Sequence, residues 1–201
     1  WGRGGRPLYC SVDPTLYYPQ AVEQRWDLGY MGTYSADRQP GLDQLMLEVA
    51  RQNASLRAVV AGSQYPPGLD WPPNVERIEH LSPAQHNAFY NAQRFTLNIT
   101  RQDMRQAGFS PSVRLFEAAA CGTPIISDAW PGLEHFFRPG QEILVSDGAA
   151  GTRFYLETLS EAQRQAIAER ARARVLAEHT AAHRAREFEA YVSERQPALA
   201  R

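Results

Sequence analysis

The chain has 201 residues, 43% of them hydrophobic, and a formal net charge of −1, so it is long enough to bury a full core. All 21 basic residues are arginine, which we take as composition bias in a bacterial genome, and 22 acidic residues balance them, which argues against nucleic acid as a partner. The sequence shows no metal-ligand spacing of Cys and His and no apolar run long enough for a membrane span. We expect a soluble, cytoplasmic, globular protein with no integral membrane segment.

Strands and helices alternate from residue 27 to residue 145. Apolar periodicity predicts strands at 27–31, 56–61, 75–79, 95–99, 125–128 and 142–145. It predicts helices at 41–53, 83–93, 112–121 and 130–137, and a loop at 101–112. Six strands alternating with helices predict an α/β fold with a doubly wound parallel sheet. Ligands of such sheets bind beyond the carboxyl ends of the strands.

The turn after the first strand is a candidate phosphate site. Gly32 allows close backbone approach, Thr33 and Tyr34 follow it, and Arg38 lies at the start of the next helix, where a diphosphate would lie. An ordinary turn into a helix is the alternative. The fingerprint G-x-G-x-x-G is not present, which disfavours a nicotinamide or flavin cofactor.

Polar residues also follow the third and fourth predicted strands. His80 could line a pocket for a nucleobase, although a lone histidine at a strand end is more often structural. Asn98 ends the fourth strand, and Arg101 begins the loop after it. An arginine can bind two phosphate oxygens at once, so Arg101 is the stronger candidate.

The segment at 108–128 reads as a loop, a short helix and a buried strand. Ser110 can cap the helix with Pro111 at its first position, so that the free amides near Ser112 and the helix dipole favour an anion. Arg114 and Glu117 share one helical stripe and would face outward beside that anion, unless they form an ordinary surface ion pair. Packing against the sheet is expected from Val113, Leu115, Phe116 and Ala119.

The run SPSVRLFEAAACG within this segment resembles the C-terminal donor-binding domain of GT-B glycosyltransferases of the group 1 type. Within them it is similar to the CgeB-like group of spore maturation proteins, and the resemblance covers roughly residues 7–192. In retaining GT-B enzymes, two glutamates eight positions apart bind the sugar and the ribose of the donor. Glu117 matches the second, whereas Phe109 takes the place of the first.

The resemblance implies a nucleoside diphosphate sugar as donor substrate. Charge develops on the diphosphate when the glycosidic bond breaks, and Arg38 and Arg101 would stabilise it, with the amides at 110–112 and Arg114. Glu117 would bind the ribose. The chain contains no Asp-x-Asp pair, so we expect no cofactor and no metal.

The resemblance also implies a domain organisation. Residues 1–25 are expected to be a linker from a missing N-terminal, acceptor-binding domain, and 26–159 the nucleotide-sugar-binding domain. Residues 160–201 are expected to form a pair of helices, 160–179 and 181–195, that packs on it. Such a segment of a hexosyltransferase should bind the donor and catalyse little or nothing by itself.

Two other functions fit the same fold. A sugar-nucleotide epimerase or hydrolase would need acid and base carboxylates in a cleft, and Glu117 is the single candidate evident. A non-catalytic binding module is favoured slightly by Phe109. Donor sugar, base and acceptor stay open, as do retention or inversion of configuration and the oligomeric state.

Overall fold

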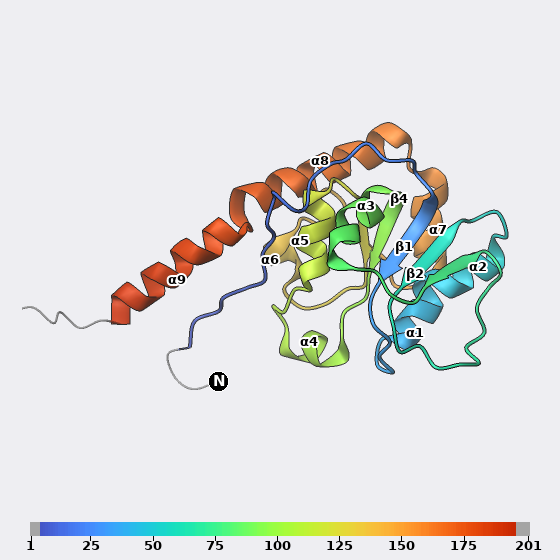
Figure 1. The fold of residues 1–201 in the computed structure, drawn as a ribbon, viewed down its shortest axis with the longest axis horizontal. Coiled ribbons are helices and arrows are strands. Elements are labelled where there is room, and N and C mark those ends of the chain that lie inside the picture. The colour runs from blue at the N-terminus through green and yellow to red at the C-terminus, as the bar shows by residue number, and fades with distance from the viewer. Residues whose placement is uncertain (1–4, 196–201) are drawn as a thin grey trace, which may run out of the picture.

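The computed structural model describes residues 5–195, which form a parallel six-stranded sheet between two layers of helices (Figure 1). The order β3-β2-β1-β4-β5-β6 is that of a doubly wound sheet, so the predicted α/β fold class is confirmed. The strands are β1 (Trp26–Met31), β2 (Ala58–Ala61), β3 (Val75–Ile78), β4 (Gln93–Asn98), β5 (Ile125–Ser127) and β6 (Leu144–Val145).

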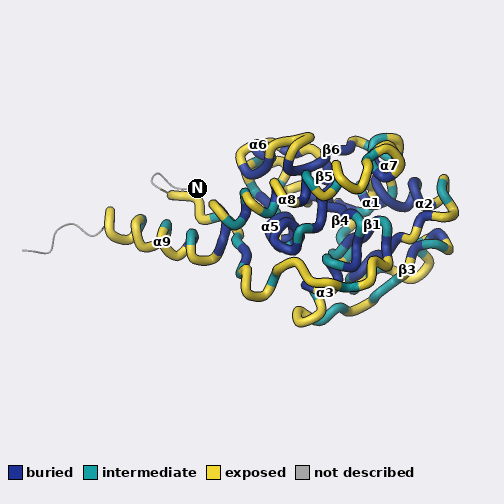
Figure 2. Tube along the Cα trace, turned by 90° about the horizontal axis from the view of Figure 1, so that it is seen from above, coloured by how far each residue is buried: buried dark blue, intermediate teal, exposed yellow. Residues whose placement is uncertain are grey.

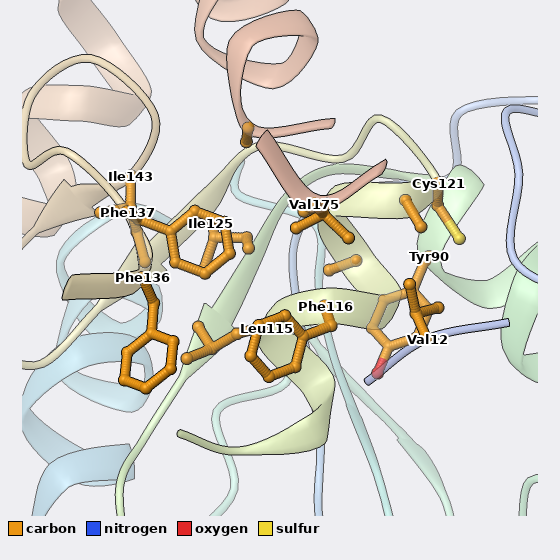
Figure 3. Close-up of a cluster of buried hydrophobic side chains, with 14 of the residues drawn as sticks. Val12, Tyr90, Leu115, Phe116, Cys121, Ile125, Phe136, Phe137, Ile143 and Val175 are labelled. Atoms are coloured by element: carbon orange, nitrogen blue, oxygen red, sulfur yellow. The ribbon is translucent and has the colours of Figure 1, made fainter. Parts of the chain in front are cut away.

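Both faces of the sheet are buried, as expected for parallel strands covered by crossover helices. Along β2, Val59 points into one core and Val60 into the other. The first core lies under α3 (His86–Asn91), α5 (Val113–Ala120), α6 (Leu133–Phe136) and α8 (Glu161–Glu178). Figure 3 shows part of this core, including Leu115 and Phe116 of α5 and Val175 of α8.

The second core lies under the helical segment at 39–52 and α7 (Ala149–Thr158). The segment at 39–52 comprises α1 (Gln39–Leu42), a π-helical turn η1 (Asp43–Leu47) and α2 (Glu48–Gln52). Leu45, Met46 and Leu47 are consecutive in sequence and all buried. Because a π turn contains one residue more than an α turn, it brings this wide apolar set onto the sheet.

The N-terminal segment packs on the junction between α8 and α9 (Ala181–Arg195), beside the first core. Residue Val12 forms a parallel bridge with Thr180, between α8 and α9. Helix α8 packs against α5. Helix α9 instead projects from the body, and its Phe188 and Val192 are exposed (Figures 1 and 2). Residues 196–201 of the predicted helical segment lie outside the described part.

Several local predictions need correction. Helix α5 starts at Val113 with Ser112 as its N-cap, so the predicted cap at Ser110 with Pro111 in the first turn is wrong. Val113 is exposed instead of packing against the sheet. The predicted loop at 101–112 contains α4 (Gln102–Ala107), and α7 was not predicted. A short 3-10 turn η2 (Pro83–Gln85), capped by Ser82, precedes α3.

Among the described residues, none of the helices combines the length and the apolar character that a membrane span requires.

Candidate functional site

A cavity of about 420 Å³ opens at the carboxyl ends of β1, β2 and β3. Its wall includes Gly32 after β1, Gly62 after β2, and His80 after β3. A Cβ atom on Gly62 would lie 2.1 Å from the carbonyl oxygen of Gly32, so the two loops touch and only glycine fits at position 62. The predicted residues Gly32, Thr33 and His80 therefore line one cavity.

Arg114 reaches under the loop that follows β1. Its Nε donates to the carbonyl oxygen of Met31 at 2.7 Å, and its Nη1 donates to Oδ1 of Asn98 at 2.9 Å. A Cβ on Gly32 would lie 3.2 Å from Nη2 of Arg114. The structure thus brings the predicted residues Gly32, Asn98 and Arg114 together, but Arg114 is only 7% exposed and does not face outward.

Arg38 is buried beside the same loop, with 8% exposure. Its Nη2 donates to the carbonyl oxygen of Thr33, and its Nε has no hydrogen-bond partner among residues 5–195. Burial lowers the pKa of Arg38, and the positive charges of Arg114 and Arg101 lower it further. Arg101 itself is exposed at the N-cap of α4. Arg38, Arg101 and Arg114 therefore together create a positive potential around the Arg38 guanidinium.

These arginines have no acidic partner. Within the described residues, neither Arg38, Arg101 nor Arg114 has a carboxylate oxygen within salt-bridge distance. A buried cation without a counter-ion is costly unless an anion from outside the chain compensates it. This edge of the sheet can therefore accept an anionic ligand.

A second polar group lies at the ends of β4 and β5. Nδ2 of Asn98 donates to Oγ of Ser127 at 2.9 Å, and Oγ1 of Thr100 donates to Oδ1 of Asp128 at 2.8 Å. Burial raises the pKa of Asp128, although the hydrogen bonds from Thr100 act against this. Asp128 was not among the predicted site residues, although a carboxylate directly after an apolar strand is a signal for it.

Glu117 forms no ion pair with these arginines within the described residues. Oη of Tyr90 donates to its Oε2 at 2.9 Å, while Arg114 binds Met31 and Asn98. The alternative of an ordinary ion pair between Arg114 and Glu117 is therefore wrong. Glu117 is half-buried.

The remaining predicted residues occupy the rim. Pro111 is buried, and Ser110 and Ser112 are half-buried. Neither serine hydroxyl makes a hydrogen bond in the described part of the chain. The ring of Tyr34 lies 5.5 Å from that of Tyr65. Tyr65, which the sequence analysis missed, donates through its hydroxyl to the carbonyl oxygen of Gly32 at 3.1 Å.

Within residues 5–195, we find no group of three or more His, Cys, Asp or Glu side chains arranged to bind a metal ion.

The sheet order and the cleft at its carboxyl edge define a Rossmann-like α/β domain with the GT-B glycosyltransferase fold. A profile of a family described as glycosyl transferase-like matches residues 38–190. The chain belongs to this glycosyl transferase-like family. No curated protein matches the sequence.

Solved structures of glycosyltransferases share the fold at low identity. Sucrose-phosphate synthase from Thermosynechococcus elongatus superposes with a TM-score of 0.73 at 17% identity, over 94% of this chain and 52% of that one. HepE from Anabaena, in complex with UDP-glucose, superposes with a TM-score of 0.74 at 13% identity, over 95% of this chain and 59% of the HepE chain. The C-terminal domain of the group 1 glycosyltransferase LpcC from Francisella tularensis superposes with a TM-score of 0.67 at 17% identity, over 85% of this chain and 99% of the LpcC domain. The chain spans about half the length of sucrose-phosphate synthase.

Proposed function

We propose that this chain is the donor-binding half of a glycosyltransferase that transfers a hexose from a nucleoside diphosphate sugar. The observation that carries the proposal is the pair of buried arginines, Arg38 and Arg114, which lack an acidic partner among the described residues. A diphosphate supplies the missing negative charge. HepE, which shares the fold, was solved with UDP-glucose, which makes uridine diphosphate the first ligand to test.

The proposed donor lies across the carboxyl edge of the sheet. Its diphosphate faces Arg38, Arg101 and Arg114 and the amides at the start of α5, and these groups stabilise the charge that develops on bond cleavage. Its base enters the cavity of about 420 Å³ beside His80. Its ribose meets Glu117. We propose that this binding needs no metal ion.

The acceptor side is part of the same proposal. The match covers only 52% of the sucrose-phosphate synthase chain and 59% of the HepE chain, so we place the acceptor site in a domain that precedes this one in a longer protein. The chain alone should bind donor without transferring sugar. We further propose a cytoplasmic, bacterial enzyme of the CgeB-like group, on the strength of the SPSVRLFEAAACG run.

A non-catalytic nucleotide-sugar-binding module is the second candidate. Phe109 favours it, because a phenyl ring cannot make the hydrogen bonds to sugar hydroxyls that a carboxylate makes. Both candidates predict nucleotide binding. Only the transferase predicts sugar transfer when the chain is part of the longer protein.

Calorimetric titration with UDP-glucose, GDP-mannose and dTDP-glucose tests the donor site. Replacing Arg38 with Met should weaken binding of the preferred nucleotide sugar by roughly 10- to 100-fold, the effect of one or two lost charge-assisted hydrogen bonds. The matched control is Arg153→Met, because Arg153 lies on the surface of α7, where it pairs with Glu157. EDTA should leave the affinity unchanged. If R38M binds like R153M, the diphosphate does not lie at Arg38 and the proposal is wrong.

A further inference from the structure

The connection between β2 and β3 is unusual for a parallel sheet. Adjacent parallel strands are commonly joined by a crossover helix, but residues 62–74 run from β2 to β3 without one (Figure 1). Connections of this length that lack secondary structure of their own are uncommon in compact domains, and they usually carry a function. The cavity of the proposed donor site is lined only by the start of this loop, at Gly62 and Ser63. The rest of the loop has no assigned role.

Hydrogen bonds and prolines fix the conformation of this loop. Nη2 of Arg51 donates to the carbonyl oxygen of Asp70 at 3.1 Å. Nδ2 of Asn74 lies between 2.9 and 3.2 Å from three backbone carbonyl oxygens of the segment that precedes β2. The backbone is restricted further by four prolines, Pro66, Pro67, Pro72 and Pro73. A ligand of this loop therefore meets a preformed surface, which lowers the entropic cost of binding.

The loop forms most of the wall of a second cavity, of about 510 Å³. The rings of Tyr65 and Trp71 lie 5.3 Å apart in this wall, and the guanidinium of Arg77 lies over both. Further lining side chains are Gln64, Pro66, Pro67, Leu69 and Glu79. The wall thus combines flat apolar rings with polar groups, and its volume is in the range of small-molecule sites.

The charges of this wall argue against an anionic ligand. Arg77 donates to the carbonyl oxygens of Val60 and Gly62, at 2.8 and 3.0 Å, and the carboxylate of Glu79 belongs to the same wall. One cation and one anion leave no surplus charge to attract a diphosphate, in contrast to the three arginines of the proposed donor site. Hydrogen bonds to a neutral ligand are available, with Arg77 and Gln64 as donors and Glu79 and Gln64 as acceptors.

We propose that this second cavity is an accessory carbohydrate site that binds a neutral pyranose. A pyranose presents C–H groups on its faces and hydroxyl groups around its edge, so it matches flat rings surrounded by donors and acceptors. The two cavities share Gly62 and Glu79, so the second one lies next to the proposed base pocket and away from the arginines at the proposed diphosphate. The inference rests on the proposed function for one point, namely that sugar transfer takes place elsewhere along the sheet edge.

NMR titration of the 201-residue chain, labelled with nitrogen-15, tests this site. The probes are methyl α-D-glucopyranoside, methyl α-D-mannopyranoside and methyl β-D-galactopyranoside. At least one of them should shift the indole N–H signal of Trp71, with a dissociation constant of about 1 mM, which a ligand of this size reaches at ordinary ligand efficiency. The Trp71 signal is identified by its loss in Trp71→Phe. The indole signal of Trp130, which lies in the first core, should not move.

Gln64 supplies the variant that tests the location of the ligand. The side chain is exposed, and Gln64→Ala removes its amide without adding strain at φ of 68°, because both residues carry a Cβ. This variant should weaken binding of the glycoside about 3- to 10-fold, the effect of one lost hydrogen bond. Gln106→Ala, on the exposed helix α4, is the matched control and should bind like the parent.

Uridine diphosphate separates the two cavities. At saturation it should change the affinity for the glycoside by less than about twofold, because the proposed nucleotide and saccharide occupy different walls. The accessory site is overturned if uridine diphosphate displaces the glycoside, or if Q64A binds the glycoside like Q106A. It is also overturned if none of the three glycosides shifts the Trp71 signal at about 20 mM. Binding of nucleotide sugars is measured in separate titrations, so the proposed function stands or fails independently of these results.

Discussion

The ring of Phe109 occupies the space in which a side chain at Gly132 would begin. A Cβ atom on Gly132 would lie 2.6 Å from Cδ1 of Phe109, and the amide of Phe109 donates to the carbonyl oxygen of Pro131 at 2.8 Å. Phe109 has φ of 47°, which is uncommon for a residue with a bulky side chain, and the residue is 53% exposed. The loop before α5 and the loop after β5 are therefore fitted to each other at the rim of the candidate site.

Replacing Gly132 with Ala should destabilise the domain by about 2–4 kcal/mol, since the change combines a φ of +94° with a collision against Phe109. Gly140 is the matched control. Its φ is +76°, but nothing lies within 4 Å of the added Cβ, so Gly140→Ala should show the backbone cost of about 1 kcal/mol alone. Urea unfolding of both variants measures the difference. Equal losses would contradict the fit described here.

Thr100 should be important for stability because it donates two hydrogen bonds to the buried carboxylate of Asp128. Its amide donates at 3.1 Å and its hydroxyl at 2.8 Å. Thr100→Val removes the hydroxyl and should lower the free energy of unfolding by about 1–3 kcal/mol. Thr100→Ser keeps the hydroxyl and should therefore retain most of the stability of the parent. Denaturant titrations at neutral pH check this. If the valine variant is as stable as the serine variant, the hydroxyl contributes nothing to holding Asp128.

His179 should make the stability pH-dependent. It is buried, and Nη2 of Arg184 donates to its Nδ1 at 2.7 Å. Its Nε2 makes no hydrogen bond within the described residues and lies 4.0 Å from Oε2 of Glu178. Burial first, and then the charge of Arg184, lower its pKa from 6.5 to about 4. The unfolded chain therefore binds the proton more tightly than the folded chain. Stability from this residue is complete above pH 6.5 and falls as the pH drops toward 4.

The comparison that isolates His179 is with His179→Gln, which cannot titrate. Between pH 6.5 and pH 4 the parent should lose about 1–3 kcal/mol more than this variant in the free energy of unfolding. Thermal or urea unfolding across this range supplies the measurement. Parallel pH profiles would show that His179 is not held neutral by the fold.

Arg77 should fix the proline-rich loop that follows β2. Its guanidinium lies 4.1 Å from the centroid of the Tyr65 ring and 4.3 Å from that of the Trp71 ring, and it donates to the carbonyl oxygens of Val60 and Gly62. Arg77→Lys keeps the charge but loses the planar stack and the paired donors. We expect faster limited proteolysis within 64–74. Arg153→Lys, on the surface of α7, should leave the cleavage rate unchanged.

Much of the architecture follows from local signals. The strands β1, β2 and β4 are apolar runs with glycine or polar residues at their ends, and such runs alternating with helices lead to a parallel sheet. Helix α4 was missed because its sequence buries no residue and so carries no apolar periodicity. The start of α5 was misplaced because Ser110 and Ser112 flank Pro111, and either serine can serve as the cap.

The candidate site could be predicted only in part. Arg38 and Arg114 were found because each follows a turn or begins a helix at a strand end, and the sheet brings those points together. That Arg114 is buried, and that Glu117 contacts Tyr90, depends on packing between segments far apart in sequence. The roles assigned to these residues toward a ligand stay predictions.

The π-helical turn η1 has a consequence for the evolution of this chain. It carries one extra residue between Arg38 and the helix that packs on the sheet, so losing one residue from Asp43–Leu47 would leave a regular helix. In that shorter helix, the residues before the deletion, Arg38 included, would be rotated by about 100° about the helix axis. The guanidinium of Arg38 would then leave the carboxyl edge. A relative with a one-residue deletion here would need a different cation at this edge, although its sheet would be intact.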